Sequence, residues 1–362
     1  MVAAWRATLD TVDRIIAGEL LVPHWRFKQG FDLKAYFETA ERTDFVMILS
    51  GFPAKSRSTY LGKSTGNHGA EPAHVLEWRM RFRVSSHLDY HLEDPATFFF
   101  ALKCIETNGQ HIENESLLIE PTADVDEFTI GVGMNRFTRI RTSGSGPLSL
   151  RYHADVETSI QLADVSTLIS EGPHLLVPDA VPFLFPSRYC QSDRLRQQAL
   201  DLFGHLQDPH SIAAGISDWV FEHVAYRSGT SNEQSSAVET LEQRQGVCRD
   251  FSHLAIGFCR AMNMPARYVT CYSHRLEPPD FHAVFEVFIG GMWYVFDPTR
   301  LAPLNGLVRI ATGRDAADAA VCTIFGNPVL NNIQVACESL DGDFVPITRD
   351  TLHGANQAIA LL

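Results

Sequence analysis

A cysteine directly after a glycine turn opens the segment of the chain with the clearest helical pattern. From residue 248 to residue 262, apolar side chains recur at steps of three and four, the spacing of one face of a buried helix. Asn263 and Pro265 are typical of the end of such a helix. Cys248 is therefore expected in the first helical turn, where unpaired backbone N–H groups and the helix dipole favour a nucleophilic thiolate. Free cysteines are often simply buried, so the interpretation depends on the residues that follow.

A β-hairpin with a histidine and an aspartate follows the cysteine segment. Residues 281–289 have the pattern of a strand and contain His282. The glycine pair at 290–291 predicts a tight two-residue turn, and residues 292–296 predict the returning strand. Asp297 closes this strand, so the sequence places an acid near the histidine on one hairpin.

The predicted turn also fixes which residues of the two strands face each other. It makes Ile289 face Met292, and five residues further along each strand Val284 faces Asp297. His282 shares a face with Val284 because side chains alternate, so Asp297 becomes its diagonal neighbour, with Cα atoms about 7–8 Å apart. A carboxylate can reach an imidazole nitrogen across this gap.

These three residues predict a Cys–His–Asp triad. His282 is expected to hold Cys248 as a thiolate and to act as base, while Asp297 fixes the tautomer of the imidazole. The backbone N–H of Cys248 is expected to form part of an oxyanion hole, with a second donor that the sequence leaves open.

Four short motifs resemble a known family. They are residues 246–251, 265–269, 282–283 and 293–299. In this order the chain resembles the transglutaminase-like superfamily, and more narrowly the bacterial transglutaminase-like cysteine protease group. The resemblance implies that Cys248 is the nucleophile, His282 the base and Asp297 the orienting acid. The family usually has Trp two residues after the histidine, where this chain has Val284, so the wall of the substrate cleft is expected to differ.

The resemblance and the local patterns together predict an α+β protein. A papain/transglutaminase-like core, with a Cys-bearing helix packed on an antiparallel sheet that bears the His and Asp, follows a small antiparallel β-domain. Periodicity predicts strands at 80–92, 97–105, 115–119, 127–133, 137–141, 148–156, 267–272 and 329–338, and helices at 193–206, from 209 onward and at 237–244.

The predicted organisation has four parts. Residues 1–79 are expected to form a poorly ordered N-terminal extension, 80–170 an N-terminal β-rich domain, 171–340 the transglutaminase-like catalytic domain, and 341–362 a C-terminal tail. The pattern changes abruptly at Met80, which favours Met80 as the biological start, with a genuine N-terminal arm as the alternative.

Composition narrows the partners and the location. A net charge of −13 argues against nucleic acid or an anionic membrane as partner. The seven cysteines are scattered without a Cys-x-x-Cys pair, so free thiols in a reducing compartment are expected. The chain lacks the pattern of a signal peptide or a membrane span, which favours a cytoplasmic protein. No metal-binding or phosphate-binding motif is present, so no cofactor or metal is expected.

The expected function is cysteine-dependent hydrolysis of a peptide or other amide bond through a thioester. Hydrolysis is favoured because the core shows no extra domain to bind an amine acceptor. The alternatives are a protein-glutamine gamma-glutamyltransferase that crosslinks proteins, and a catalytically silent scaffold. The substrate and the oligomeric state stay open.

Residues near the motif have plainer interpretations. Asp250 suits the helix dipole, and His253, one turn beyond the cysteine, is expected to be structural. Cys259 and Cys271 are expected in the core. The loop at residues 274–280 is expected near the mouth of the site.

Overall fold

The computed structural model describes residues 77–131, 134–169 and 172–362. The predicted extension at residues 1–79 lies outside the described residues except for its last three, which begin the first described strand. The start at Met80 therefore stays a prediction. Within the described ranges, no helix has the length and apolar character needed to cross a lipid bilayer.

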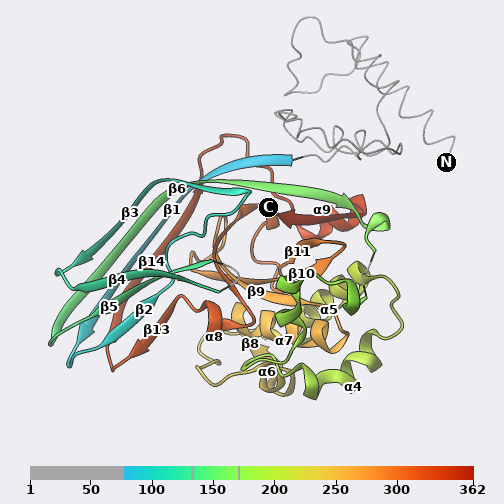
Figure 1. Ribbon diagram of the computed structural model, residues 1–362, viewed down its shortest axis with the longest axis horizontal. Helices are drawn as coiled ribbons and strands as arrows, with labels where there is room; N and C mark the ends of the chain where they lie inside the picture. Colours follow the sequence, from blue (N-terminus) through green and yellow to red (C-terminus); the bar gives the residue numbers. More distant parts are fainter. Residues whose placement is uncertain (1–76, 132–133, 170–171) are drawn as a thin grey trace, which may run out of the picture. The chain divides into compact units, whose positions relative to one another are not determined.

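A nine-stranded antiparallel sheet forms the framework of the described part (Figure 1). Its strand order is β12-β9-β10-β11-β15-β6-β1-β14, and β3 pairs with β6 in addition. The strands are β1 (Glu77–Leu92), β3 (Gln110–Glu120), β6 (Gly146–Asp164), β9 (Ala266–Ser273), β10 (His282–Ile289), β11 (Met292–Phe296), β12 (Leu307–Gly313), β14 (Val329–Ser339) and β15 (Gln357–Leu361).

A four-stranded sheet packs on the N-terminal strands. Its order is β13-β2-β5-β4, with β2 (Thr97–Phe100), β4 (Asp124–Ile130), β5 (Asn135–Arg141) and β13 (Cys322–Phe325). Phe98 and Phe100 point from β2 onto Tyr90 of β1, with ring centroids 5.2 and 6.0 Å apart. All six strands predicted between residues 80 and 156 are confirmed, although their ends differ by several residues.

The C-terminal residues connect the two predicted domains. Tyr294 of β11 pairs with Ala360 of β15, and Leu162 of β6 pairs with Ile359 of the same strand. The sheet is therefore continuous from the β-rich region into the core. Residues after 340, for which the sequence predicts no regular element, contain β15 and the helix α9 (Arg349–Ala355).

The helices lie together beside β9, β10 and β11 (Figure 1). They are α4 (Ser192–Phe203), α5 (Pro209–His223), α6 (Ala237–Gln243) and α7 (Cys248–Ala261), and the short α8 (Ala316–Ala319) lies after β12. Two further strands, β7 (Ala225–Tyr226) and β8 (Gln245–Gly246), pair in parallel before α7. These bounds confirm the predicted helices to within a few residues.

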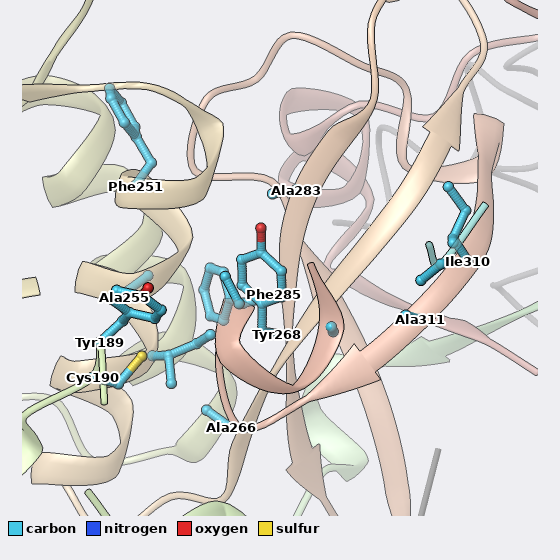
Figure 2. Packing of buried hydrophobic residues seen from close by; sticks show 14 of the residues in the cluster. Tyr189, Cys190, Phe251, Ala255, Ala266, Tyr268, Ala283, Phe285, Ile310 and Ala311 are labelled. Carbon is cyan, nitrogen blue, oxygen red and sulfur yellow. The ribbon is translucent and has the colours of Figure 1, made fainter. Parts of the chain in front are cut away.

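Helix α7 is the central helix of the core. It contacts α4, α5, α6, β9 and β10, and all of its side chains from Phe251 to Ala261 are buried. Figure 2 shows Phe285 and Tyr268 on the strands beside the helix that carries Ala255. Ser252 donates a hydrogen bond to the carbonyl oxygen of Ala283 at 3.1 Å, which links the helix to β10. The predicted Cys-bearing helix packed on an antiparallel sheet is confirmed.

Candidate active site

Cys248 is the first residue of α7, and its neighbours hold the start of this helix. The carboxylate of Asp250 accepts a hydrogen bond from the N–H of Val247 at 2.9 Å, which closes the first turn. A Cβ atom at Gly246 would lie 2.7 Å from the Cβ of Asp250, so glycine is required there. Arg249 pairs with the same carboxylate. The residues around the cysteine therefore fix the position of Cys248 at the start of the helix.

The hairpin brings His282 and Asp297 together as predicted. Ile289 pairs with Met292 and Phe285 with Phe296, which confirms the predicted register. His282 begins β10, and Asp297 directly follows β11. The Nε2 atom of His282 lies 3.0 Å from Oδ2 of Asp297, and both side chains are almost fully buried.

Asp297 is held by donors besides the histidine. Thr299 donates to Oδ1 from its N–H at 2.9 Å and from its hydroxyl at 2.7 Å, and the N–H of Ala302 donates to Oδ2 at 3.3 Å. Burial raises the pKa of the Asp297 carboxyl, but the charge and hydrogen bond of His282 and the bonds from Thr299 outweigh burial and lower it. The carboxylate therefore stays ionised and fixed in orientation.

Removing the Thr299 hydroxyl should slow turnover without affecting substrate binding. Thr299→Val keeps the shape and the backbone N–H bond but leaves Oδ1 of Asp297 without one donor. We expect kcat to fall about tenfold, because a hydrogen bond to a charged group contributes roughly 1.5–3 kcal/mol. KM should stay unchanged, and Thr299→Ser should retain the wild-type kcat. Steady-state kinetics of the two variants check this, and equal kcat values for both would contradict it.

The imidazole of His282 lies next to Cys248 and is positively charged at neutral pH. Because Nε2 faces Asp297, Nδ1 is the nitrogen left for the thiol. Burial lowers the pKa of His282, but the Asp297 carboxylate and the neighbouring Cys248 thiol raise it to about 10. The imidazole is then protonated at neutral pH, which is the state that stabilises a thiolate.

Cys248 and His282 line one cavity of ≈ 530 Å³. Cys248 is partly exposed there, so its thiol is accessible from the cavity. The cavity walls come from several elements, including Tyr189, Tyr268, Phe281, Ala316 and residues 320–324. Asp297 lines a second cavity of ≈ 430 Å³ instead, so the acid lies behind the histidine as seen from the nucleophile.

Other residues near the motif are structural or lie elsewhere. His253 is fully buried, stacks on Tyr189 with ring centroids 5.0 Å apart, and accepts the N–H of Ala316 at 3.1 Å. Nδ1 of His274 lies 2.9 Å from the carbonyl oxygen of Cys337, away from the catalytic cavity. Cys259 and Cys271 are buried, as predicted. His253 is therefore a core residue, also as predicted.

Tyr226 is a neighbour of the nucleophile that sequence reasoning missed. It pairs with Gly246 through the short parallel strands β7 and β8, which brings it beside Cys248. Partial burial and the adjacent Cys248 thiol raise the pKa of the Tyr226 hydroxyl, so this hydroxyl stays a donor. The only sequence signal was a tyrosine between a helix and a loop, which is too common to single out.

No three His, Cys, Asp or Glu side chains in the described part of the chain are grouped so that they could hold a metal ion.

Comparisons with known proteins identify the family of this fold. Residues 196–298 match the transglutaminase-like superfamily, and residues 80–175 match the bacterial transglutaminase N-terminal domain. A solved structure of a candidate cysteine protease from Cytophaga hutchinsonii is 45% identical, covers 79% of this chain and 100% of its own, and has a TM-score of 0.76. The fold and site define an α+β protein with a cysteine at a helix start. The chain belongs to the transglutaminase-like superfamily.

Curated relatives match over shorter stretches. An uncharacterized protein of Mycobacterium leprae is 30% identical over 122 residues, which are 31% of this chain and 43% of that protein. An uncharacterized protein of Mycobacterium bovis is 27% identical over 178 residues, which are 45% of this chain and 55% of that protein. The chain thus spans about half the length of the curated relatives it matches.

Proposed function

We propose that this protein is a cysteine-dependent amide-bond hydrolase, of peptidase or amidase type, with Cys248, His282 and Asp297 as its triad. The observation that supports it most is that His282, which contacts the buried Asp297 at 3.0 Å, lines the same cavity as a partly exposed Cys248. The likeness to a candidate cysteine protease supports the same class.

The proposed chemistry follows from the arrangement of the triad and the positive charge of His282. The Cys248 thiolate attacks the amide carbonyl carbon, and the developing oxyanion is stabilised by the backbone N–H of Cys248. Protonated His282 gives its proton to the leaving amine as the C–N bond breaks, and a thioester remains. Neutral His282 then takes a proton from water, whose oxygen attacks the thioester. The C–S bond breaks, the carboxylic acid leaves, and the thiolate with its imidazolium partner is restored.

Trapping the nucleophile tests the proposal directly. With limiting iodoacetamide at neutral pH, peptide mass mapping should find Cys248 alkylated well before the other six thiols. Burial raises the pKa of Cys104 and of Cys190 to about 12, and the pKa values of the remaining four are raised as well. Cys322 lies in the same cavity and serves as the internal comparison. Alkylation of Cys248 no faster than of Cys322 would indicate a silent scaffold.

Hydrolysis and transfer are separated by the fate of the acyl group. With a glutamine-containing peptide and a labelled amine, a hydrolase releases ammonia or a cleaved product without incorporating label. Incorporation of label that outpaces ammonia release would contradict hydrolysis and indicate a crosslinking enzyme.

A cytoplasmic location is part of the proposal. All seven cysteines are unpaired, and such thiols are usual in a reducing compartment.

A further inference from the structure

Strand β13 (Cys322–Phe325) is an edge strand whose outer side is free. It ends the four-stranded sheet and pairs with β2 alone, so within the described ranges no strand covers its other edge. Figure 1 shows β13 at the side of this sheet opposite β4. An uncovered edge presents unpaired main-chain N–H and C=O groups, which can pair with another extended segment.

The pairing pattern identifies which main-chain groups point outward. In an antiparallel pair, residues that bond to the partner strand alternate with residues that do not. The N–H of Ala101 donates to the carbonyl oxygen of Val321 at 2.8 Å, so Val321 faces the partner side. The next residue, Cys322, and then Ile324 therefore direct their N–H and C=O groups away from β2.

This outward edge belongs to the wall of the catalytic cavity. Val321, Cys322 and Ile324 line the same ≈ 530 Å³ cavity as Cys248 and His282. The side chain of Ile324 is 37% exposed. The free main-chain groups and an apolar side chain are therefore continuous with the space in front of the nucleophile.

The composition of β13 fits a docking edge. Charged side chains and proline usually protect an exposed edge from pairing. The residues of β13, Cys-Thr-Ile-Phe, include neither. The opposite edge strand of the same sheet, β4, carries Asp124, Asp126 and Glu127 and is protected in this way. Charged residues thus protect the β4 edge, which lies away from the cavity, whereas the β13 edge at the cavity has no such protection.

We propose that β13 binds an extended polypeptide substrate by strand addition. The substrate pairs with the outward main-chain groups of Cys322 and Ile324, places an apolar side chain against Ile324, and presents its amide to Cys248. Main-chain pairing recognises an extended conformation more than a particular sequence. The proposal deepens the proposed function by naming an unfolded polypeptide, and not a small amide, as its substrate class.

Binding of fluorescein-labelled casein, an unfolded polypeptide, tests the proposal without requiring turnover. In a Cys248→Ala background, Ile324→Pro removes one outward N–H and leaves the β2 pairing intact. We expect the Kd from fluorescence anisotropy to rise about tenfold, since a lost main-chain hydrogen bond and a bulky ring at the edge each weaken strand addition. Ile324→Lys should have a similar effect through charge and keeps the proposal testable if the proline variant fails to fold.

The matched control lies on the opposite edge of the same sheet. Ile130 is 54% exposed, and because the N–H of Met134 donates to Gly131 at the hairpin turn, the main-chain groups of Ile130 also point outward. Ile130→Pro and Ile130→Lys should leave casein binding unchanged. Equal weakening by both positions, or unchanged Kd in both Ile324 variants, would overturn the proposal.

Further outcomes distinguish a substrate-binding edge from a dimer interface, and the edge proposal from the hydrolase proposal. If Cys248→Ala protein fails to bind casein, or if size-exclusion chromatography shows a dimer that only the Ile324 variants dissociate, then β13 is not a substrate edge. If casein binds as expected but Cys248 shows no enhanced reactivity, the edge proposal stands and the hydrolase proposal fails.

Discussion

Replacing Cys248 with alanine should abolish turnover and leave the fold intact. In the proposed mechanism the Cys248 thiol is the nucleophile, and the other thiol of the cavity, Cys322, cannot replace it because burial raises its pKa and keeps it protonated. We expect kcat to fall at least about 10⁴-fold, the loss typical for a nucleophile that acts within a triad. Because Cys248 is at the helix start and only partly buried, the change leaves no large cavity, and circular dichroism and Tm should match the wild type.

Cys337→Ala provides the control for the loss of a thiol. This cysteine is also only partly buried but lies on β14, outside the catalytic cavity. It should retain wild-type turnover of a peptide amide. Activity that survives in Cys248→Ala would show that a different group performs the chemistry. Equal loss of activity in Cys337→Ala would show that the effect is not specific to Cys248.

The hairpin and the central helix could be predicted because their signals are local. A two-glycine turn fixes the register of β10 and β11, and the register alone places Asp297 diagonal to His282. The apolar period of α7 likewise depends only on residues within four positions of each other. Such features can therefore be predicted without knowing how the rest of the chain folds.

The residues near the site that the sequence did not predict depend on contacts between distant segments or on turns. Tyr226 reaches Cys248 only because β7 pairs with β8 in parallel, and two-residue strands leave no periodic signal. Thr299 supports Asp297 through a turn whose hydrogen bonds are visible only in three dimensions. Ile324 enters the cavity from a strand of the β-rich sheet that lies after the catalytic hairpin in sequence.

The continuity of the sheet joins the β-rich region to the core. β15 pairs with β6 on one side and β11 on the other, so residues close to the C-terminus connect the region before residue 170 to the catalytic hairpin. β13 contributes to the cavity wall from the other sheet. The cleft is thus built by both regions, and its specificity is expected to change with the β-rich part as well as with the core.

Asp297→Asn should slow the enzyme less than His282→Ala and should move its pH profile. Loss of the imidazole removes both the partner of the thiolate and the acid for the leaving amine, so kcat should fall at least about 10⁴-fold. Asp297→Asn keeps an amide oxygen that can accept the bonds from Thr299 and leaves the imidazole in place. We expect a loss of about 10²-fold, at the lower end of contributions from acid–base catalysis.

The pH profile distinguishes an orienting acid from a merely structural one. The pKa of His282 is raised to about 10, so the imidazolium is present at neutral pH and is lost as pH rises through that value. The alkaline limb of kcat/KM should therefore lie near pH 10 in the wild type. Asp297→Asn removes the largest interaction that raises this pKa, whereas burial continues to lower it, so the limb should move to lower pH. An unmoved alkaline limb with reduced kcat would mean that Asp297 supports the hairpin but does not control the charge of His282.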